Sequence, residues 1–492
     1  MYRFKLPIWV LGTAFVLASL NAFEPLEAQM AFALTGLFAA VFGTVLYGEE
    51  RLPFVAGGGL VILIAGNVTD FHHLIEGMEW VLFIKLVCLL TWVDYLNESK
   101  FFDYLIEKYL PRRLHGYKLL VVLLVLCAIS AALIDEVNSI VLMYAVTLAI
   151  VGYTVNGTKH LRLPSPVWTA VVIFLVSATN IGSQLLPLGN PVGIAVAVIA
   201  EPDLTVPDFL LYAWVPAFIV LGYYIFRLRM KYPQIIEEFT KVSVEDEDFA
   251  TLAEMPHEIE IVEYSSDEGH AHHKREHKQP SPRTLGSLFA FGLVGLLSVQ
   301  PIAMLAGYPP ADALGIFVLV LFAVTLYVAS HHNESNEALL SSLPYATLLF
   351  IVMLFGIAHG LESSGFTDLV AREVFGLTGD NQILLRVGII VIGAVVTAFM
   401  DNVIAVAVLA PIIIALGEMG VDTRGLWFQL LGVAVIAGNL TPIGSAANIL
   451  ANDRIRASWG VWWRYAGQLA LECLLVHAIA LYVWEQVLSL VL

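Results

Sequence analysis

The stretch SATNIGSQLLPLGNPVGIAV, residues 177–196, lies inside a long apolar run but contains two Asn, three Gly and two Pro. A helix that crosses a bilayer needs about 20 consecutive apolar residues. Pro removes an amide donor and Gly weakens a helix, so this stretch predicts a helix that is interrupted in its middle. Because unsatisfied amides in hydrocarbon are costly, the interruption must line a cavity or be buried in protein.

The same pattern recurs later in the chain. AGNLTPIGSAANI, residues 437–449, places Pro442, Gly444 and Ser445 where the first stretch has Pro187, Gly189 and Asn190. A second pair of polar segments, LIDEVNSIVLM (133–143) and FMDNVIAVAVL (399–409), matches Asp135 to Asp401 and Glu136 to Asn402. We interpret the Pro and Gly residues as geometric elements that open the helix. Four such breaks predict one shared cavity, where freed carbonyls and half-helix N-termini can hold ions.

The composition predicts a polytopic membrane protein. Of 492 residues, 59% are hydrophobic and only 14% are charged. The net charge of −17 describes loops, because many acids crowd into one polar stretch, and it excludes nucleic-acid binding. Cys88, Cys127 and Cys473 lie in apolar segments without pairing or metal-ligand spacing, so we interpret them as apolar fillers. No set of nucleophile, base and orienting group indicates an enzyme.

The chain divides into an extra first span and two similar halves joined by a polar linker. Spans are expected near 7–22, 28–47, 53–66, 79–95, 166–200, 208–226, 284–305, 313–330, 342–361, 426–451 and 461–491. Residues 1–27 carry the extra span, 28–232 the first repeat, 233–283 the linker, and 284–492 the second repeat. The apolar stretches 118–152 and 383–418 are of double length, and we interpret each as a re-entrant helical hairpin. The predicted fold is all-α, with about 11 transmembrane helices, two hairpins and two discontinuous helices.

Charge in the loops predicts the orientation. Cytoplasmic loops collect Lys and Arg near the ends of spans. With hairpins at both double-length stretches, one orientation makes these residues cytoplasmic: Arg3, Lys5, Lys100, Lys108, Arg112, Arg113, Lys118, Lys159, Arg162, Arg227, Arg229, Lys231, Arg454 and Arg456. The loops FEPLE, EPDLTVPD and GYPPAD, which lack Lys and Arg, then lie outside. The N-terminus and linker are therefore expected in the cytoplasm, and the C-terminus outside the cell membrane. The two repeats run in opposite directions, which is typical of secondary transporters.

The acids at the predicted hairpin tips indicate cation chemistry. A charged group at the bilayer centre costs roughly 2.5 to 3.5 kcal/mol on insertion scales, so such acids tend to mark ion or proton pathways. Removal from water favours a protonated carboxyl group, whereas a bound cation favours the carboxylate. Asp135 and Asp401 can therefore exchange a proton for a cation, although capping a helix is an alternative role for both. Glu136 could face this site or the surrounding scaffold.

Several other groups leave alternatives open. Lys85 lies deep in an apolar span, where it could pair with an acid such as Asp94, tune a carboxylate or snorkel to the surface. Segments 101–118 and 363–382 mix apolar and charged residues at helical spacing and predict helices along the membrane interface, with a surface loop as the alternative. Glu472 and His477 are interpreted as packing or dimer-face groups. The linker histidines, His270, His272, His273 and His277, could bind a metal, but a solvated loop is the favoured interpretation.

These motifs resemble the ArsB/NhaD-type permeases of the ion transporter superfamily, which includes divalent-anion symporters and the melanosomal P protein. The resemblance covers about 28–230 and 284–490 and rests on DEVNSIVLM, SATNIGSQLLPLGNP, FMDNVIAVAVLAP and AGNLTPIGSAANI. It implies scaffold spans around a mobile unit of hairpins and unwound helices, in a homodimer with an elevator movement. It further implies that these residues face the substrate: Asp135, Asn138, Asn180, Asn190, Asp401, Asn402, Asn439, Thr441, Ser445 and Asn448. The chain departs from the family at Pro191-Val192-Gly193, where Pro-Pro-Asn is common, and at Leu185 and Leu186, where small polar residues are common.

We therefore predict a sodium (or lithium)/proton antiporter that uses these residues together with Glu136 and Ser183. Proton- or sodium-coupled transport of arsenite, silicate or a dicarboxylate is the alternative, and a passive ion channel is a second class. No organic cofactor and no resident metal ion is expected.

Overall fold

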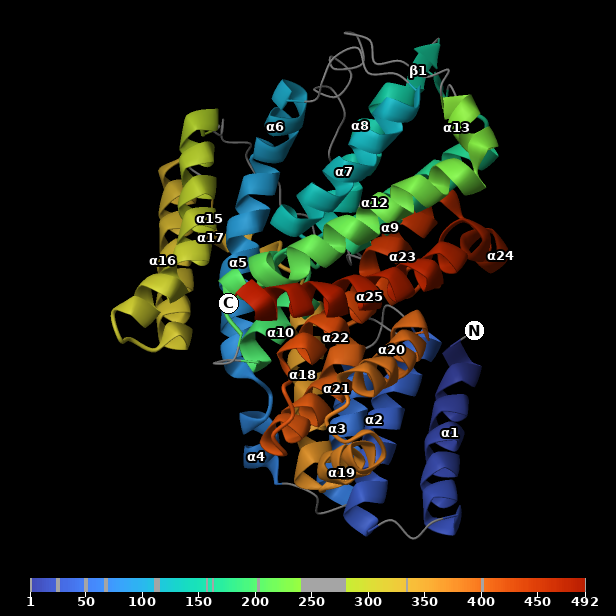
Figure 1. Ribbon diagram of the computed structural model, residues 1–492, viewed down its shortest axis with the longest axis vertical. Coiled ribbons are helices and arrows are strands. Elements are labelled where there is room, and N and C mark those ends of the chain that lie inside the picture. The colour runs from blue at the N-terminus through green and yellow to red at the C-terminus, as the bar shows by residue number, and fades with distance from the viewer. Residues whose placement is uncertain are drawn as a thin grey trace.

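The computed structural model describes residues 2–23, 27–47, 52–65, 70–109, 116–155, 158–161, 163–200, 204–239, 280–332, 335–399 and 402–491. Asp401, the linker histidines and most of the polar linker lie outside the described residues. The described chain is helical apart from two short antiparallel strands, β1 (Gly152–Val155) and β2 (Thr158–Leu161) (Figure 1). The predicted all-α fold is confirmed, with this one small strand pair added.

The first half follows the predicted order of spans. Its helices are α1 (Tyr2–Phe23), α2 (Ala28–Tyr47), α3 (Leu52–Ala65), α4 (Phe71–Glu76), α5 (Trp80–Glu98), α6 (Phe101–Tyr109), α7 (Gly116–Ile134), α8 (Glu136–Val151), α9 (Ser165–Gly182), η2 (Pro187–Gly189), α10 (Pro191–Ile199), α11 (Val206–Asp208), η3 (Phe209–Ala213), α12 (Trp214–Lys231) and α13 (Pro233–Phe239). The stretch 118–152 is a helical hairpin, α7–α8, and the stretch 166–200 is broken between α9 and α10, as expected.

The second half repeats this order. Its helices are α15 (Pro282–Leu305), α16 (Pro310–His331), α17 (Asn336–Ser341), α18 (Tyr345–Ser363), α19 (Phe366–Thr378), α20 (Gln382–Phe399), α21 (Asn402–Glu418), α22 (Arg424–Gly438), α23 (Ala446–Ile455), α24 (Trp459–Trp462), η4 (Trp463–Gly467) and α25 (Gln468–Val491). The hairpin α20–α21 and the break between α22 and α23 correspond to those of the first half. Within the described residues, eight helical segments are long and apolar enough to cross a membrane, and further apolar helices are shorter.

Several contacts between the two halves occur twice: a helix of the first half packs against a helix of the second half, and their equivalents pack in the same way with the halves interchanged. α3 packs against α18, and the equivalent α16 packs against α5. In the same way α8 packs against α23, and α21 packs against α10. Both closing helices begin with a π-helical turn, η3 before α12 and η4 before α25. Such exchange is expected of two copies related by a pseudo-two-fold axis. The repeat boundaries at 28–232 and 284–492 stay a prediction that these contacts support.

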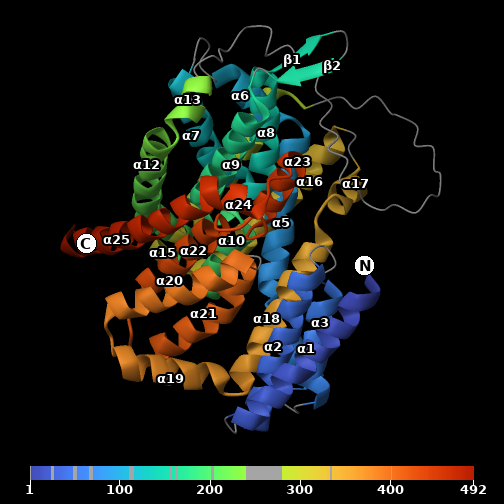
Figure 2. The same ribbon diagram turned by 90° about the vertical axis from the view of Figure 1, so that its right-hand side faces the viewer.

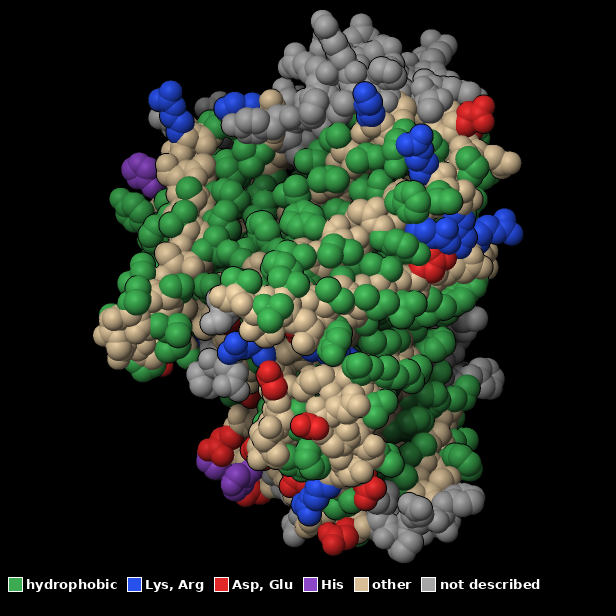
Figure 3. Space-filling model, in the orientation of Figure 1, with side chains coloured by type: hydrophobic (Ala, Val, Ile, Leu, Met, Phe, Trp, Pro, Cys, Tyr) green, Lys and Arg blue, Asp and Glu red, His purple; other side chains and the backbone are tan. Residues whose placement is uncertain are grey.

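The views show how the helices gather. The hairpin α7–α8 lies with α9 and α12 in the upper part of the molecule, whereas α20 and α21 lie with α19 in the lower part (Figures 1 and 2). Hydrophobic side chains cover the middle of the face in Figure 3. On that face most Lys and Arg side chains lie in the upper half and most Asp and Glu side chains in the lower half. This distribution is in line with the predicted cytoplasmic position of the end that carries α6 and α13.

The two predicted interfacial segments form amphipathic helices, α6 and α19. On α19, Arg372 and Asp368 form an exposed ion pair one turn apart. The surface-loop alternative is thus wrong for the residues within these two helices. Their position at a membrane interface stays a prediction.

Ion pairs fasten the last helix to its neighbours. Arg227 of α12 binds Glu472 of α25, with 2.6 Å between Nε and Oε2, and the hydroxyl of Tyr223 donates to the same carboxylate at 2.9 Å. Arg386 of α20 binds Glu485 of α25, and this pair is almost fully buried. These contacts assign Glu472 a packing role within the chain.

Breaking the buried pair should destabilise the second half. In Arg386→Met the carboxylate of Glu485 keeps its burial but loses its cationic partner, which should cost about 3–5 kcal/mol. The check is the melting temperature of the purified protein in detergent micelles. Arg372→Met on exposed α19 serves as the control and should melt like the wild type. A double variant, Arg386→Met with Glu485→Met, should recover most of the loss, and a double variant as unstable as the single one would contradict the explanation.

Candidate functional site

The first hairpin turns at Asp135, which adopts a left-handed backbone conformation with φ of 68°. This conformation ends α7, and Asp is among the residues that tolerate it best. The Oδ1 atom of Asp135 accepts hydrogen bonds from the backbone N–H groups of Val137 (2.6 Å) and Asn138 (3.1 Å), which caps α8. The helix cap that the sequence offered as an alternative role for Asp135 is therefore present.

The first break is held open by its own polar groups. Ser183 ends α9, and Asn190 begins α10 by accepting the backbone N–H of Gly193 at 2.6 Å. The Nδ2 atom of Asn190 donates back to Oγ of Ser183 at 2.8 Å. Gly189 sits so close to the chain end of α9 that a Cβ atom there would lie 2.0 Å from the Ser183 carbonyl oxygen. Pro187 and Gly189 thus act geometrically, and the polar contacts belong to Ser183 and Asn190.

The second break has the same construction. Ser445 begins α23 by accepting the backbone N–H of Asn448 at 3.2 Å. Asn448 donates through Nδ2 to the carbonyl oxygens of Gly438 (2.8 Å), the last residue of α22, and of Thr441 (3.1 Å), within the break. The hydroxyl of Thr441 donates to the carbonyl oxygen of Ala398, near the end of α20. The second break is therefore tied to the second hairpin.

Asn180 joins the two breaks. Its Nδ2 atom lies 2.8 Å from Oδ1 of Asn439, 2.9 Å from Oδ1 of Asn448 and 3.2 Å from Oγ of Ser445. An amide group has only two hydrogens, so three oxygen atoms compete for them. All four side chains are buried. Three side-chain oxygens from the second half of the chain thus surround the amide nitrogen of Asn180, which belongs to the first half.

Glu136 connects this cluster to both hairpins. Its side chain is only 2% exposed, and it accepts hydrogen bonds from Nδ2 of Asn402 at 3.3 Å and from Oγ of Ser183 at 3.4 Å. The Ser183 hydroxyl has a single hydrogen, for which the carbonyl oxygen of Asn180, at 2.9 Å, competes with Glu136. The two hairpin tips and the two breaks therefore form one continuous, buried polar network. These two contacts place Glu136 beside the first break and the second hairpin.

Asp135 and Asn138 face another group of polar residues. The Nδ2 atom of Asn138 donates to Oδ2 of Asp135 at 2.8 Å and to Oδ1 of Asp94 at 3.3 Å, and its Oδ1 atom accepts from Asn97 at 3.3 Å. Asp94 and Asn97 belong to α5, so this cluster joins the hairpin to a neighbouring span. Sequence reasoning considered Asp94 only as a partner for Lys85 and did not mention Asn97. A carboxylate near the end of an apolar span was the signal that could have placed Asp94 at the hairpin.

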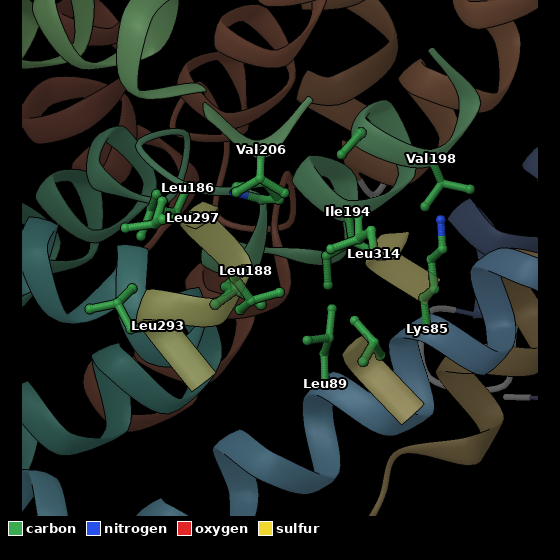
Figure 4. A pocket seen from close by; sticks show the side chains of 14 residues that line it. Lys85, Leu89, Leu186, Leu188, Ile194, Val198, Val206, Leu293, Leu297 and Leu314 are labelled. Atoms are coloured by element: carbon green, nitrogen blue, oxygen red, sulfur yellow. The ribbon is translucent and has the colours of Figure 1, made fainter. Parts of the chain in front are cut away.

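Lys85 and Leu186 line an apolar cavity, and Leu185 packs among small apolar side chains. Lys85 is buried and lines a small apolar cavity with Leu186, Leu188 and helices of the scaffold, where its side chain extends along the cavity wall (Figure 4). Leu185 packs with Ala132 and Ala217. The two leucines that differ from the family pattern, Leu185 and Leu186, therefore pack outside the polar network. Lys85 is only 5% exposed, which argues against snorkelling, and its pairing with an acid stays a prediction.

Among the predicted site residues, the structure brings one group together and leaves others apart. The network contains Glu136, Asn180, Ser183, Asn190, Asn402, Asn439, Ser445 and Asn448, with Thr441 at its edge. Asp135 and Asn138 form the adjoining cluster with α5. Asp401 lies outside the described residues, next to Asn402 in the chain.

Comparison with known proteins identifies a family model that matches most of the chain. The model, described as a citrate transporter, matches residues 44–374 and 357–484. Both hairpins and both breaks fall within these residues. The match therefore includes every part of the polar network.

Individual relatives are more distant. A transporter of Mycobacterium tuberculosis described as uncharacterized is 26% identical over 470 residues, which cover 92% of this chain and 98% of that protein. The human P protein is 22% identical over 482 residues, covering 86% of this chain and 56% of that protein. The crystal structure of the YdaH transporter of Alcanivorax borkumensis superposes with a TM-score of 0.55 at 14% identity, covering 94% and 98% of the two chains. At that identity the similarity is one of fold.

Proposed function

The chain belongs to the citrate transporter family of integral membrane transporters, and from this premise we propose that it is a secondary active transporter that exchanges a small cation for protons. Sodium and lithium are the leading cations. The proposal includes the homodimer and the elevator movement that the motif resemblance implies. It assigns the cation to the polar network between the two breaks, and the proton to the carboxylates of the first hairpin.

The convergence of oxygens at Asn180 is the observation that carries the proposal. Hard cations prefer oxygen ligands, and unwound helices of secondary transporters bind sodium through such oxygens. Asn439, Ser445 and Asn448 supply three oxygens within 3.2 Å of one amide nitrogen. Rotating the Asn180 amide by half a turn would replace that nitrogen with a fourth oxygen, so a cation would have four side-chain ligands.

The caps of the half-helices favour a cation over an anion. An anion at a helix N-terminus needs free backbone N–H groups. At α10 the Gly193 N–H donates to Asn190, and at α23 the Asn448 N–H donates to Ser445. At α8 the first amides donate to Asp135. Because these donors already have partners within the chain, an anion would first have to displace the caps.

Glu136 gives the site a way to couple the two ions. A buried carboxyl group is most stable when protonated or when a cation lies beside it. Glu136 is linked to the oxygen cluster through Ser183 and Asn180, so both ions would act on one network. Proton release and cation binding would then accompany each other. Such a site transports by exchange, in contrast to a passive channel.

A carboxylate anion is the second candidate. The family model is described as a citrate transporter, and α10 and α23 both begin at the network, with the positive ends of their dipoles toward it. In that case the carboxyl groups would carry only the coupling protons.

A flux measurement distinguishes these functions. Purified protein in liposomes that enclose a pH-sensitive dye should show a proton movement when sodium or lithium is added, but not when potassium is added. Counterflow of labelled citrate or another organic anion, with no cation-evoked proton movement, would overturn the cation proposal. A sodium conductance that is not coupled to protons would identify a channel.

Replacing Asn180 tests the oxygen cluster. In Asn180→Ala the cation loses one ligand, and the KM for sodium should rise about tenfold, equivalent to about 1.4 kcal/mol of binding free energy. The measurement is the sodium dependence of proton movement in the liposomes. Asn336→Ala, at the start of short α17, is the matched control and should leave KM unchanged. An unaltered KM in Asn180→Ala would place the cation elsewhere.

A further inference from the structure

A row of polar side chains lies on the surface where α12 and α25 pack together. Arg227 and Lys231 follow each other one turn apart along α12. Arg227 binds Glu472 of α25, with 2.6 Å between Nε and Oε2. Lys231 donates from Nζ to Oε1 of Gln468, one turn earlier in α25, at 2.7 Å. One further turn back, in η4, lies the exposed side chain of Arg464. The row therefore holds three cations.

This row carries more positive charge than its own acid can balance. Glu472 is the carboxylate of the row, and Arg227 donates to both of its oxygen atoms. Within the part of the chain that the structure describes, neither Lys231 nor Arg464 forms an ion pair. The partner of Lys231 is the neutral amide of Gln468. Two of the three cations are thus available to an anion from outside the chain.

Exposed apolar side chains border the row on both helices. They are Phe226 and Met230 on α12, Leu471 and Leu475 on α25, and Trp463 in η4. Figure 3 shows Lys and Arg side chains gathered near the ends of α12 and α25 beside α24, with hydrophobic side chains above and below them. Cations on apolar stems next to an exposed Trp are typical of the boundary between hydrocarbon and lipid headgroups.

The same junction contacts the candidate site. The hydroxyl of Tyr232, directly after α12, donates to the carbonyl oxygen of Arg464. Two residues before Arg464, Nε1 of Trp462 donates to the backbone carbonyl oxygen of Asn439 at 3.1 Å. These residues belong to α24 and η4, and η4 is a π-helical turn of the kind that is frequent at functional positions. A group bound at Arg464 would therefore hold the segment that contacts the second break.

We propose that Lys231 and Arg464 bind the phosphate of an anionic glycerophospholipid, whose acyl chains lie along the exposed apolar side chains of α12 and α25. Lys and Arg both bind phosphate oxygens through charged N–H donors. A zwitterionic lipid offers the same phosphate, but its own cation is repelled by the row. Lys231 is predicted to be cytoplasmic, and the cytoplasmic leaflet is the one that carries anionic lipids.

The bound lipid also steadies the contact between Trp462 and Asn439, because it holds η4 in place. The proposal needs only that the chain is a membrane protein. It does not depend on which ion is transported.

Lipid titration tests the proposal on the purified full chain in detergent micelles. Phosphatidylglycerol should raise the melting temperature more than phosphatidylcholine does at equal concentration. In Lys231→Gln and in Arg464→Gln, the phosphatidylglycerol concentration that gives half of the shift should rise about fivefold, equivalent to about 1 kcal/mol. In the double variant it should rise about 25-fold, because both cations are lost. Lys231→Arg and Arg464→Lys keep the charges and should retain most of the response.

Arg372→Gln is the matched control, because it removes one exposed positive charge on α19. It should respond like the wild type. Hydrogen exchange gives a second measurement: phosphatidylglycerol should slow the exchange of backbone amides in residues 459–467 of the wild type, but not of the double variant. Equal responses to the two lipids, a wild-type response of the double variant, or unaltered exchange would overturn the proposal. An equal shift with inorganic phosphate would overturn it as well, because the row would then bind a free anion without acyl chains.

Discussion

Replacing Glu136 by Gln should reduce cation-evoked proton movement in liposomes to that of empty vesicles. The substitution keeps the shape of the side chain and an oxygen for one of its two donors, Asn402 and Ser183, but removes the group that can alternate between a proton and a cation. The site is buried, so water cannot substitute for the lost carboxylate. The measurement is the rate of the dye signal after sodium addition, with protein content and orientation matched to wild type.

A matched control separates chemistry from folding. Glu362→Gln makes the same substitution on α18, where the carboxylate is more than half exposed and pairs with His359. This variant should transport like wild type. If Glu136→Gln kept its coupled flux while Glu362→Gln behaved normally, the proton would have to be carried elsewhere, and Asp135 with Asp94 would be the next carboxyl groups to replace.

The sequence predicted the fold well because its signals are local and repeated. Hairpins, breaks and closing spans were all recognised from apolar length and from Pro and Gly inside apolar runs, and the helix boundaries agree closely with the predicted spans. The resemblance to the ion transporter superfamily is confirmed by the family match and by the similarity to the P protein. The short strands β1 and β2 and the short helices α4, α13 and α17 were not anticipated.

Side-chain pairing within the site was less predictable. Pattern matching treats Asp135 and Glu136 alike, but adjacent residues at the start of a helix point in different directions. In the structure Glu136 contacts Ser183 of the first break and Asn402 of the second hairpin. Asp135 instead contacts Asn138, which bridges to Asp94. The side of the helix on which a residue lies depends on where the hairpin turns, and that turn depends on the left-handed backbone of Asp135. A sequence motif does not record that angle.

The directions of the Leu185 and Leu186 side chains could not be predicted from the sequence either. Leu185 and Leu186 lie within the first break, at positions where small polar residues are common in the family. The structure directs Leu186 toward the cavity beside Lys85, and Leu185 toward Ala132 and Ala217. An irregular segment can turn its side chains in any direction, so neither helical nor strand periodicity could have assigned them.

Adding one methyl group at either break glycine should abolish transport. A Cβ atom on Gly189 would lie 2.0 Å from the Ser183 carbonyl oxygen, and one on Gly444 would lie 2.4 Å from the Gly438 carbonyl oxygen. In both cases the obstacle is backbone, which cannot rotate away as a side chain can. Overpacking in a well-packed core costs about 1–3 kcal/mol, and a rigid obstacle places these sites at or above the upper end. Gly189→Ala and Gly444→Ala should therefore lower the melting temperature and lose cation-evoked proton movement.

Gly388→Ala is the matched control, because nothing lies within 4 Å of a Cβ atom at that helical position. It should retain both stability and transport, since Ala also favours the helix more than Gly does. The two break variants should behave alike, because the same close approach of the chain to its own preceding turn occurs in both halves. If Gly444→Ala were tolerated and Gly189→Ala were not, the second break would be able to relax around the added methyl group. The two breaks would then be alike in structure but not in rigidity. Wild-type transport by both variants would mean that neither close approach is needed to hold the oxygen cluster in place.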